Sequence, residues 1–327
     1  MVISFKTKYL FFFGLCINFS STLAENPCTP IDSVPTIITK SGSYCLQNNL
    51  YNQESKNAIT ISVSGVIIDL KNHTLSAGVE DPGTKLFGVY SKDVRDITIK
   101  NGIIRNFMYG IYLSDSNTSS TGANSLSGGY KIENVKLVSN YFRGMRLEGA
   151  NHTVIGNTVR NTGGSIVFDN SFAIGIEIIG PGAKVESNTV VDTYSCGNGE
   201  SVAISFSNNN SGSEANRSRI INYKSTKDKC LLYHASTGRS FGIWVGGNPS
   251  FKTNAFLRDN IIDKMYYGFA FSSPTTGWYG NNLVRGATCN FLVVSDSVST
   301  FNYVGSVACP SITTDEIDEI NRHLISE

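Results

Sequence analysis

Short segments in which apolar and polar residues alternate recur along almost the whole chain. Residues 96–115 and 130–149 show the pattern clearly, and residues 152–161 followed by 172–180 repeat it. Each unit reads as a short alternating run, an asparagine, a second short run, and then a glycine-apolar-x-apolar run. Alternation of this kind gives a β-strand one buried face. The pattern therefore predicts a chain built from repeats of three short strands.

An asparagine recurs in step with these strands, at intervals of 22 to 38 residues. The recurring positions are Asn72, Asn101, Asn134, Asn157, Asn188, Asn222, Asn260 and Asn282. Asparagine tolerates the left-handed backbone of a tight bend, and stacked asparagine side chains can form a hydrogen-bonded ladder. The shortest interval sets the size of one coil, and longer intervals are expected to contain loops. Because no coil can bury its own apolar face, stability must come from stacking.

The asparagine-centred repeats and the glycine-apolar strands resemble the right-handed parallel β-helix superfamily that includes the pectate lyases. The resemblance covers roughly residues 58–309. It implies an all-β fold, a right-handed parallel β-helix that forms a solenoid of about eight to nine coils. That superfamily holds lyases, hydrolases, epimerases and non-catalytic surface proteins, so the fold does not fix the function.

Both ends of the repeat region are expected to be capped. Residues 25–57 precede the first regular repeat and form the predicted N-terminal cap. In residues 310–327, a threonine can cap a short helix that places Ile317, Ile320 and Leu324 on one face. This C-terminal cap helix would cover the open end of the sheets, where backbone groups are otherwise unpaired.

Residues 1–24 have the features of a secretory signal peptide. Lys6 and Lys8 precede the apolar run Tyr9–Phe19, and small residues end at Ala24, after which cleavage is expected. A membrane anchor is the alternative, but it needs about 20 consecutive apolar residues, and this run is roughly half that length. The mature protein is therefore expected to be secreted, periplasmic or on the cell surface.

Loss of the signal peptide leaves an even number of cysteines, which fits an oxidising compartment. Sequence neighbours suggest the disulfides Cys28–Cys45, Cys196–Cys230 and Cys289–Cys309. Six cysteines allow about 15 connectivities, so the sequence alone leaves the pairing open. Zinc coordination by these thiols is disfavoured because no CxxC motif occurs and the histidines are scattered.

The charge distribution does not indicate a nucleic-acid partner. The net charge is +1, and the only basic run lies at residues 227–229. No segment after the signal peptide is long and apolar enough to predict a membrane span. We expect no cofactor. Four aspartates at strand ends and turns could bind calcium, but acidic residues are ordinary at such positions and no calcium motif is present; they are Asp69, Asp93, Asp96 and Asp115.

In similar β-helices the ligand groove follows the sheet that is formed here by the glycine-apolar strands. We expect these strands at residues 58–61, 88–91, 110–113, 144–147, 175–178, 203–206, 242–245 and 268–271. Alternation turns the third residue of each outward, on coils about 4.8 Å apart. This outer column is Thr60, Tyr90, Tyr112, Arg146, Glu177, Ser205, Trp244 and Ala270.

The aromatic residues of this column favour a carbohydrate ligand. A flat ring stacks on the apolar side of a sugar while neighbouring polar groups reach its hydroxyls. Tyr90, Tyr112, Ser205 and Trp244 are therefore the predicted substrate-binding residues, and a polysaccharide or another glycan is the predicted partner. The alternative is that the two tyrosines only stack on each other as a cross-strand pair.

A hydrolytic pair of carboxylates can be placed at the centre of the column. Glu148 and Glu177 are expected on neighbouring coils, diagonally about 8 Å apart at the backbone, in the range of an inverting pair. Arg146 between them could hold one of them as the anion. The alternative is that Arg146 and Glu177 form only a surface ion pair.

β-Elimination on a uronic acid polymer is the second possible reaction. Arg146, together with Arg143 or Lys184, would neutralise the carboxylate of the substrate, and His234 or Tyr112 would remove the proton. His234 lies in a long insertion, where a solvated loop residue is the alternative. The motifs of pectate lyases, polygalacturonases and mannuronan epimerases are absent, so no catalytic residue can be transferred from those families.

Three functions remain open from the sequence. The first is a secreted enzyme that binds and depolymerises a polysaccharide, either a polysaccharide lyase or a glycoside hydrolase. The second is a non-catalytic carbohydrate-binding or adhesive surface protein, which the outer aromatic residues serve equally well. The third is a structural β-helix scaffold. The sequence does not decide whether any reaction takes place.

Overall fold

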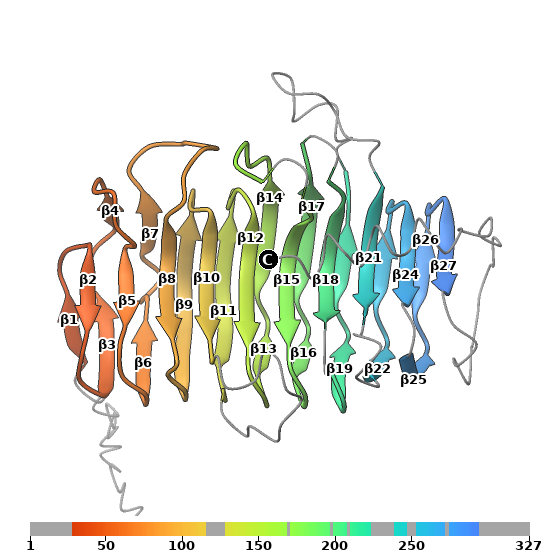
Figure 1. Cartoon of the computed structure of the whole chain (residues 1–327), viewed down its shortest axis with the longest axis horizontal. Helices are drawn as coiled ribbons and strands as arrows, with labels where there is room; N and C mark the ends of the chain where they lie inside the picture. The colour runs from red at the N-terminus through yellow and green to blue at the C-terminus, as the bar shows by residue number, and fades with distance from the viewer. Residues whose placement is uncertain are drawn as a thin grey trace, which may run out of the picture.

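The chain is an all-β solenoid throughout the part that the structure describes. This computed structural model describes residues 28–115, 128–168, 171–196, 199–207, 210–223, 239–246, 253–271 and 275–293. Within these ranges there is no helix, and the strands form one 17-stranded and one 10-stranded sheet whose pairings are all parallel. Figure 1 shows the strands following one another along the long axis of the molecule.

The 10-stranded sheet contains the glycine-apolar strands. Its members are β2 (Thr36–Ile38), β5 (Ile59–Ile61), β8 (Phe87–Lys92), β10 (Tyr109–Ser114), β12 (Arg143–Glu148), β15 (Ala173–Ile179), β18 (Ser201–Ser207), β21 (Ser240–Val245), β24 (Tyr267–Phe271) and β27 (Cys289–Val293). Each of the eight strands expected from the sequence overlaps one of these strands. The prediction of eight strands is therefore confirmed, and β2 and β27 extend the sheet at its two ends.

The 17-stranded sheet consists of two rows. The first row holds β1 (Thr29–Ile31), β3 (Gly42–Leu46), β6 (Val66–Asp69), β9 (Ile97–Arg105), β11 (Lys131–Val138), β13 (Thr153–Ile155), β16 (Lys184–Glu186), β19 (Ser213–Asn216), β22 (Thr253–Arg258) and β25 (Thr275–Gly280). The second row holds β4 (Leu50–Asn52), β7 (Thr74–Ala77), β14 (Thr158–Gly163), β17 (Thr189–Tyr194), β20 (Arg219–Ile221), β23 (Ile261–Asp263) and β26 (Leu283–Arg285). The long strands β9 and β11 run through both rows.

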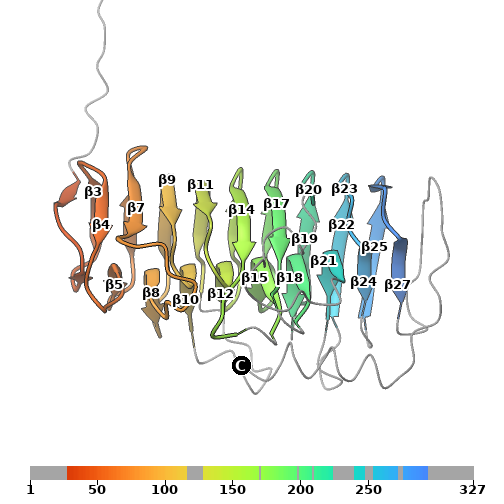
Figure 2. The ribbon, with the colours of Figure 1, turned by 90° about the horizontal axis from the view of Figure 1, so that it is seen from above.

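One coil contributes one strand to each row and one strand to the 10-stranded sheet. The coil β13–β14–β15, for example, stacks strand by strand on the coil β16–β17–β18. Figure 2 shows the second row along one long side of the molecule and the 10-stranded sheet along the other. The three-strand repeat predicted from the sequence is therefore confirmed.

The alternating pattern places one continuous apolar core inside the coils. In β11, Ile132 and Leu137 are fully buried, whereas the alternating residues Lys131 and Lys136 are exposed. The core cluster runs from Ile31 to Tyr279 and takes residues from every coil. Full burial of each such aliphatic side chain stabilises the fold by about 1.5–3 kcal/mol. The stability of any coil therefore depends on its neighbours.

The corner between the first two strands of a coil has two positions with different roles. The backbone is in the left-handed conformation at Asn101 and Asn134, with φ values of 57° and 55°. Asp259, at the same corner of a later coil, has a φ of 57°. The residues that follow them, Gly102 and Val135, are buried. Asn101 and Asn134 thus make the bend that was predicted for them, whereas the inward ladder position is one residue later.

Four of the recurring asparagines occupy this inward position and form hydrogen bonds from coil to coil. Asn188 Oδ1 accepts from the backbone N–H of Asn157 at 2.9 Å and from its Nδ2 at 3.0 Å. Asn282 Oδ1 accepts from the same two groups of Asn260 at 3.0 and 2.9 Å. These side chains satisfy buried backbone donors that the corner leaves without strand partners.

Asn222 does not belong to the ladder, contrary to expectation. Ser218 occupies the position instead: its hydroxyl accepts from the Asn188 N–H at 3.4 Å, and its own N–H donates to Asn260 Oδ1 at 3.0 Å. Asn222 follows β20, where its N–H donates to the Asp263 carbonyl. A serine can substitute for asparagine here because its hydroxyl also accepts a hydrogen bond.

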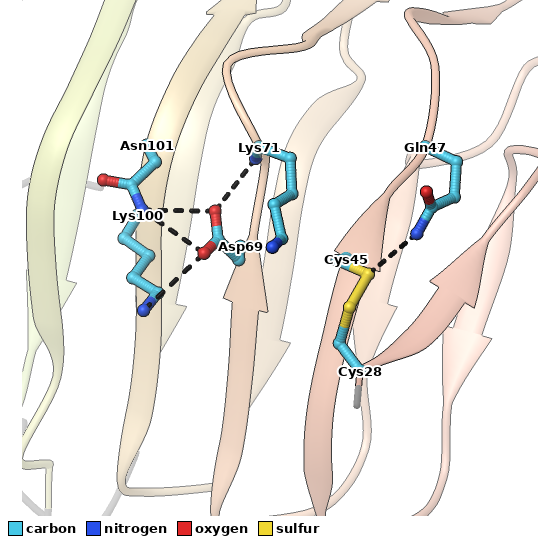
Figure 3. Close-up of a disulfide and its surroundings, with 7 residues drawn as sticks. All are labelled: Cys28, Cys45, Gln47, Asp69, Lys71, Lys100 and Asn101. Atoms are coloured by element: carbon cyan, nitrogen blue, oxygen red, sulfur yellow. Dashed lines mark hydrogen bonds and ion pairs between the residues drawn. A yellow bond between two sulfur atoms is a disulfide. The ribbon is translucent and has the colours of Figure 1, made fainter. Parts of the chain in front are cut away.

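The predicted disulfide Cys28–Cys45 is present. Its Cα atoms are 5.7 Å apart, and it joins the residue before β1 to β3 (Figure 3). Gln47 Nε2 donates to Cys45 Sγ at 3.1 Å. Because β1 also pairs with β3, the disulfide fixes the first segment of the described chain to the sheet.

The other cysteines are consistent with two further disulfides. Cys196 and Cys289 are both disulfide-bonded. Their expected partners, Cys230 and Cys309, lie outside the described residues. The pairing of these four cysteines therefore stays a prediction.

The two ends of the chain remain predictions. The proposed signal peptide, residues 1–24, and the proposed cap helix, residues 310–327, lie outside the described residues. Of the N-terminal cap assigned to residues 25–57, the described part forms β1 to β4, which pair into the two sheets.

Candidate functional site

The outer column of the 10-stranded sheet has the register that the sequence predicts. Each residue of the column pairs with the next on the neighbouring strand, from Thr60 through Tyr112 and Arg146 to Trp244 and Ala270. Residues more than two hundred positions apart in the chain therefore belong to one line of stacked neighbours.

Exposure divides this column into two halves. Tyr90, Tyr112 and Arg146 are partly exposed, whereas Glu177 and Trp244 are each 1% exposed. Ser205 and Ala270 are fully buried, and among the described residues the Ser205 hydroxyl and Trp244 Nε1 have no hydrogen-bond partner. The expectation of a continuous solvent-facing column is therefore wrong for its second half.

A second apolar cluster outside the coil core accounts for this burial. Trp244 and Ala270 pack there with Phe172, which precedes β15, and with the outward residues of the neighbouring column, which are Ile174, Val202, Phe241, Tyr267 and Cys289. The Trp244 ring lies edge-on against Phe241, with centroids 5.1 Å apart. Trp244 therefore stabilises the outer face of the sheet and is not presented to a ligand in this structure.

Four aromatic rings form a half-buried group on the first half of the column. Phe87 stacks on Tyr90 and Tyr109 stacks on Tyr112, with centroids 5.1 and 5.2 Å apart. Phe87 meets Tyr109 edge-on at 5.2 Å, and Tyr90 meets Tyr112 at 5.8 Å. These four residues, Phe87, Tyr90, Tyr109 and Tyr112, are called the aromatic patch below. The cross-strand contact considered as an alternative exists, yet Phe87, Tyr90 and Tyr112 keep part of their surface exposed.

Phe87 and Tyr109 were not predicted as site residues. Strict alternation from Tyr112 points to Gly110 as the next outward residue, but a Cβ at Gly110 would lie 2.7 Å from the Gly144 carbonyl oxygen. The chain bends at this glycine, the strand pairing skips it, and the outward position moves to Tyr109. Phe87, Tyr109 and Arg143 pair in register as a second outward column. Each stands directly before a repeated glycine, and this position in the sequence would have identified the column.

Four charged side chains adjoin the aromatic patch. Glu177 Oε2 accepts from Arg143 Nε at 2.9 Å and lies 3.4 Å from Arg146 Nη1. Arg146 Nε pairs with Glu148 Oε1 at 2.5 Å, and the Tyr112 hydroxyl donates to the same Glu148 oxygen at 3.1 Å. Arg143, Arg146, Glu148 and Glu177, called the charge cluster below, carry formal charges that sum to zero.

The pKa values of Glu177, Arg146 and the adjoining Tyr112 are shifted by burial and by their charged neighbours. Burial acts to raise the pKa of Glu177, but the adjacent charges of Arg146 and Arg143 outweigh it and leave the pKa below its ordinary value. Burial acts to lower the pKa of Arg146, and Glu177 and Glu148 instead raise it. Burial, followed by the charge of Glu148, raises the pKa of Tyr112. At neutral pH Glu177 is therefore an anion and Tyr112 a neutral phenol.

This arrangement weakens the hydrolytic roles predicted from the sequence. Glu148 and Glu177 do lie around Arg146, as expected, but both bind this one guanidinium. A buried carboxylate with a lowered pKa is a poor general acid. The predicted surface ion pair between Arg146 and Glu177 is present, but it is a buried pair.

The groups proposed for β-elimination are brought together only in part: Arg143 and Arg146 both contact Glu177, and Tyr112 lies beside Arg146. Arg143 is 1% exposed, donates to the Phe172 carbonyl and packs its guanidinium 3.8 Å from the centre of the Phe142 ring. Lys184 begins β16 in the 17-stranded sheet and does not belong to this face. A raised pKa makes Tyr112 a poor base, and His234 lies outside the described residues.

No cluster of metal-ligating side chains is found in the part of the chain that the structure describes. Asp69, one of the four calcium candidates, accepts from Lys71 N–H at 2.9 Å and Asn101 Nδ2 at 3.2 Å, and lies 3.6 Å from Lys100 Nζ (Figure 3). Its carboxylate thus holds the left-handed corner of the next coil in place.

The comparisons with known proteins return no match. No protein-family model, no curated protein and no solved structure matches the chain. Among the described residues there is also no helix with the length and hydropathy needed to cross a bilayer.

Proposed function

We propose that this protein is a secreted right-handed parallel β-helix of the pectate-lyase-like superfamily that binds a polysaccharide on the outer face of its 10-stranded sheet. The observation that carries the proposal is the aromatic patch beside the charge cluster, a group of four contacting rings of which Phe87, Tyr90 and Tyr112 remain partly open to solvent. The three-strand coils, the asparagine ladder and the Cys28–Cys45 disulfide support the fold and the secreted location.

The chemistry of the patch suits a sugar. Its rings offer apolar faces on which the C–H side of a pyranose can stack. The Tyr90 and Tyr112 hydroxyls and the partly exposed Arg146 are polar groups at its rim, within one or two coils of one another. A linear saccharide lying across the strands would therefore meet rings and hydrogen-bonding groups together.

Binding without cleavage is the function that the charges favour. Glu177 is buried as an anion against two arginines, so it is not poised to exchange protons with a substrate. Depolymerisation by a lyase or a hydrolase is the alternative outcome. Incubation with a panel of uronic and neutral polysaccharides distinguishes them, because a lyase creates absorbing unsaturated ends, a hydrolase creates reducing ends, and a binding protein creates neither.

Replacement of Tyr90 by alanine tests the proposed surface. Tyr90 is partly exposed and contacts Phe87 and Tyr112, so its loss should remove a stacking face while the coil core stays intact. Affinity electrophoresis is carried out in gels that contain the polysaccharide of the panel that retards the wild-type protein, called the retained polysaccharide. We expect binding about tenfold weaker, the effect of losing roughly 1–1.5 kcal/mol of aromatic contact. Tyr51→Ala, an exposed tyrosine of the other sheet at 52%, is the matched control and should bind like the wild type. Equal binding by all three proteins contradicts the proposal.

A further inference from the structure

The second row of the 17-stranded sheet carries exposed basic residues that no acidic residue neutralises. Arg105 in β9, Lys136 in β11, Arg160 in β14 and Arg219 in β20 are all exposed. Within the described part of the chain, none of the four forms an ion pair. These four residues are called the basic patch below. Figure 2 shows β9, β11, β14, β17 and β20 side by side, on the long side away from β8, β10 and β12.

The strand register places these cations close together. Arg105 and Arg160 both pair with Val138, so they lie two coils apart, about 10 Å at about 4.8 Å per coil. Lys136 lies on the coil between them, two residues along the strand. Lys136 also shares a column with Thr158, Thr189 and Arg219. Like charges at these separations repel one another, and nothing within the described fold compensates for that repulsion.

Three of the acids near the basic patch are already engaged. In the adjoining row, Glu133 pairs with Lys131 at 2.6 Å, and Glu186 pairs with Arg217. Asp192, within β17, is buried and accepts from the Tyr223 N–H at 2.7 Å. These three acids therefore do not offset the basic patch, which keeps an excess of positive charge within the described fold.

We infer that the basic patch is a second binding site, for an anionic polysaccharide such as a uronic or sulfated polymer. Its cations spread over a sheet face rather than converging on a point, which suits an extended chain of repeated negative charges better than a single small anion. The partly exposed hydroxyls of Thr158 and Thr189 lie in the same column and can bind sugar oxygens.

Two other anionic partners fit the basic patch less well. A lipid surface is normally bound by a basic face combined with large apolar side chains that enter the bilayer. Ile103 and Val138, which alternate with these cations, are only partly exposed, and Ile261, the neighbour of Arg219 on β23, is 36% exposed. Single-stranded nucleic acid is normally bound by aromatic stacking platforms. The outward residues among these cations are threonine and aliphatic, and the aromatic residue of these strands, Tyr194, stands at the last position of β17 and is only partly exposed.

The test compares a patch variant with a charge-matched control. The variant Arg105→Gln/Lys136→Gln/Arg160→Gln alters only exposed side chains. The control Lys40→Gln/Lys56→Gln/Arg95→Gln removes the same formal charge from exposed residues of the N-terminal coils. Binding of the full-length mature protein is measured to immobilised polygalacturonate and dextran sulfate, with unsubstituted dextran as the uncharged polymer and phosphatidylserine vesicles as the lipid surface.

The wild type and the control should bind both polyanions, and the patch variant should bind about tenfold more weakly, because each exposed charge contact contributes only about two- to threefold. Binding should fall steeply as salt rises from about 0.01 M to about 1 M. An unchanged patch variant, an equal loss in the control, or binding to the vesicles but to neither polyanion would overturn the inference. Tyr90→Ala should leave binding to dextran sulfate intact, so failure of this site is distinguishable from failure of the aromatic patch.

Discussion

Glu177 holds two arginines on the outer face of the sheet, and its removal should destabilise the protein strongly. In Glu177→Leu, the side chain of Arg143 keeps its charge while 1% exposed and loses its carboxylate partner at 2.9 Å. Arg146 loses one of its two carboxylates and keeps Glu148. Breaking one partner of a buried pair typically costs about 3–5 kcal/mol, and we expect a loss of free energy of unfolding in that range.

The matched control removes the stranded charge as well. In Arg143→Met/Glu177→Leu, both positions become apolar beside Phe142 and Phe172, and replacement of a whole buried pair is often neutral. Relative to the single variant, the double variant gives up the contacts of Arg143, among them the packing on Phe142 and the hydrogen bond to the Phe172 carbonyl, which is worth about 1–3 kcal/mol. It should therefore be more stable than the single variant, although one more native residue has been changed.

Equilibrium unfolding in urea, followed by circular dichroism, measures this difference. The midpoint of the single variant should fall well below that of the wild type, and the midpoint of the double variant should recover at least half of the loss. A single variant as stable as the wild type would refute the buried charge cluster. So would a double variant whose loss of stability equals the sum of the losses measured for Glu177→Leu and for Arg143→Met alone.

Three further predictions concern stability. His152 is buried and uncharged because burial lowers its pKa to about 3 from 6.5. Between these pH values the unfolded chain binds a proton that the folded protein does not, so the free energy of unfolding should decline by up to about 5 kcal/mol as pH falls from about 6.5 to about 3. His152→Phe should show a shallower decline in acid unfolding. Asn188→Ala should cost about 1–3 kcal/mol in urea unfolding because the preceding coil loses the acceptor for its buried N–H, whereas Asn254→Ala, an exposed site, should change little. Cys28→Ser/Cys45→Ser should cost about 3 kcal/mol, seen as faster proteolysis of the N-terminal coils, and unchanged proteolysis would contradict that role.

The fold was predictable because the repeat constrains it at every coil. Alternation fixes which residues of a strand face inward, and equal spacing fixes which residues of different coils are neighbours. Tyr112, Arg146 and Glu177 were therefore aligned correctly from the sequence alone. The ladder was less predictable: a serine replaces asparagine at Ser218, and the bend residues precede the ladder by one position.

The exposure of the site was not predictable from the same pattern. Alternation shows that Glu177 and Trp244 point away from the coil core, but it does not show what packs against them there. Trp244 is covered because Phe241, on its own strand, and other large residues on neighbouring strands also point outward and cluster with it. Tyr109 was missed for a local reason, since the bend at Gly110 shifts the outward position by one residue.

Hydroxyl-radical footprinting with a saturating oligosaccharide of the retained polysaccharide tests the account most directly. Protection should fall on Tyr90 and Tyr112, the partly exposed rings of the aromatic patch, and should leave the exposed Tyr51 and Tyr223 as reactive as in the free protein. Protection of Tyr51 or Tyr223 with no change at Tyr90 and Tyr112 would place the ligand elsewhere and contradict the proposed binding face.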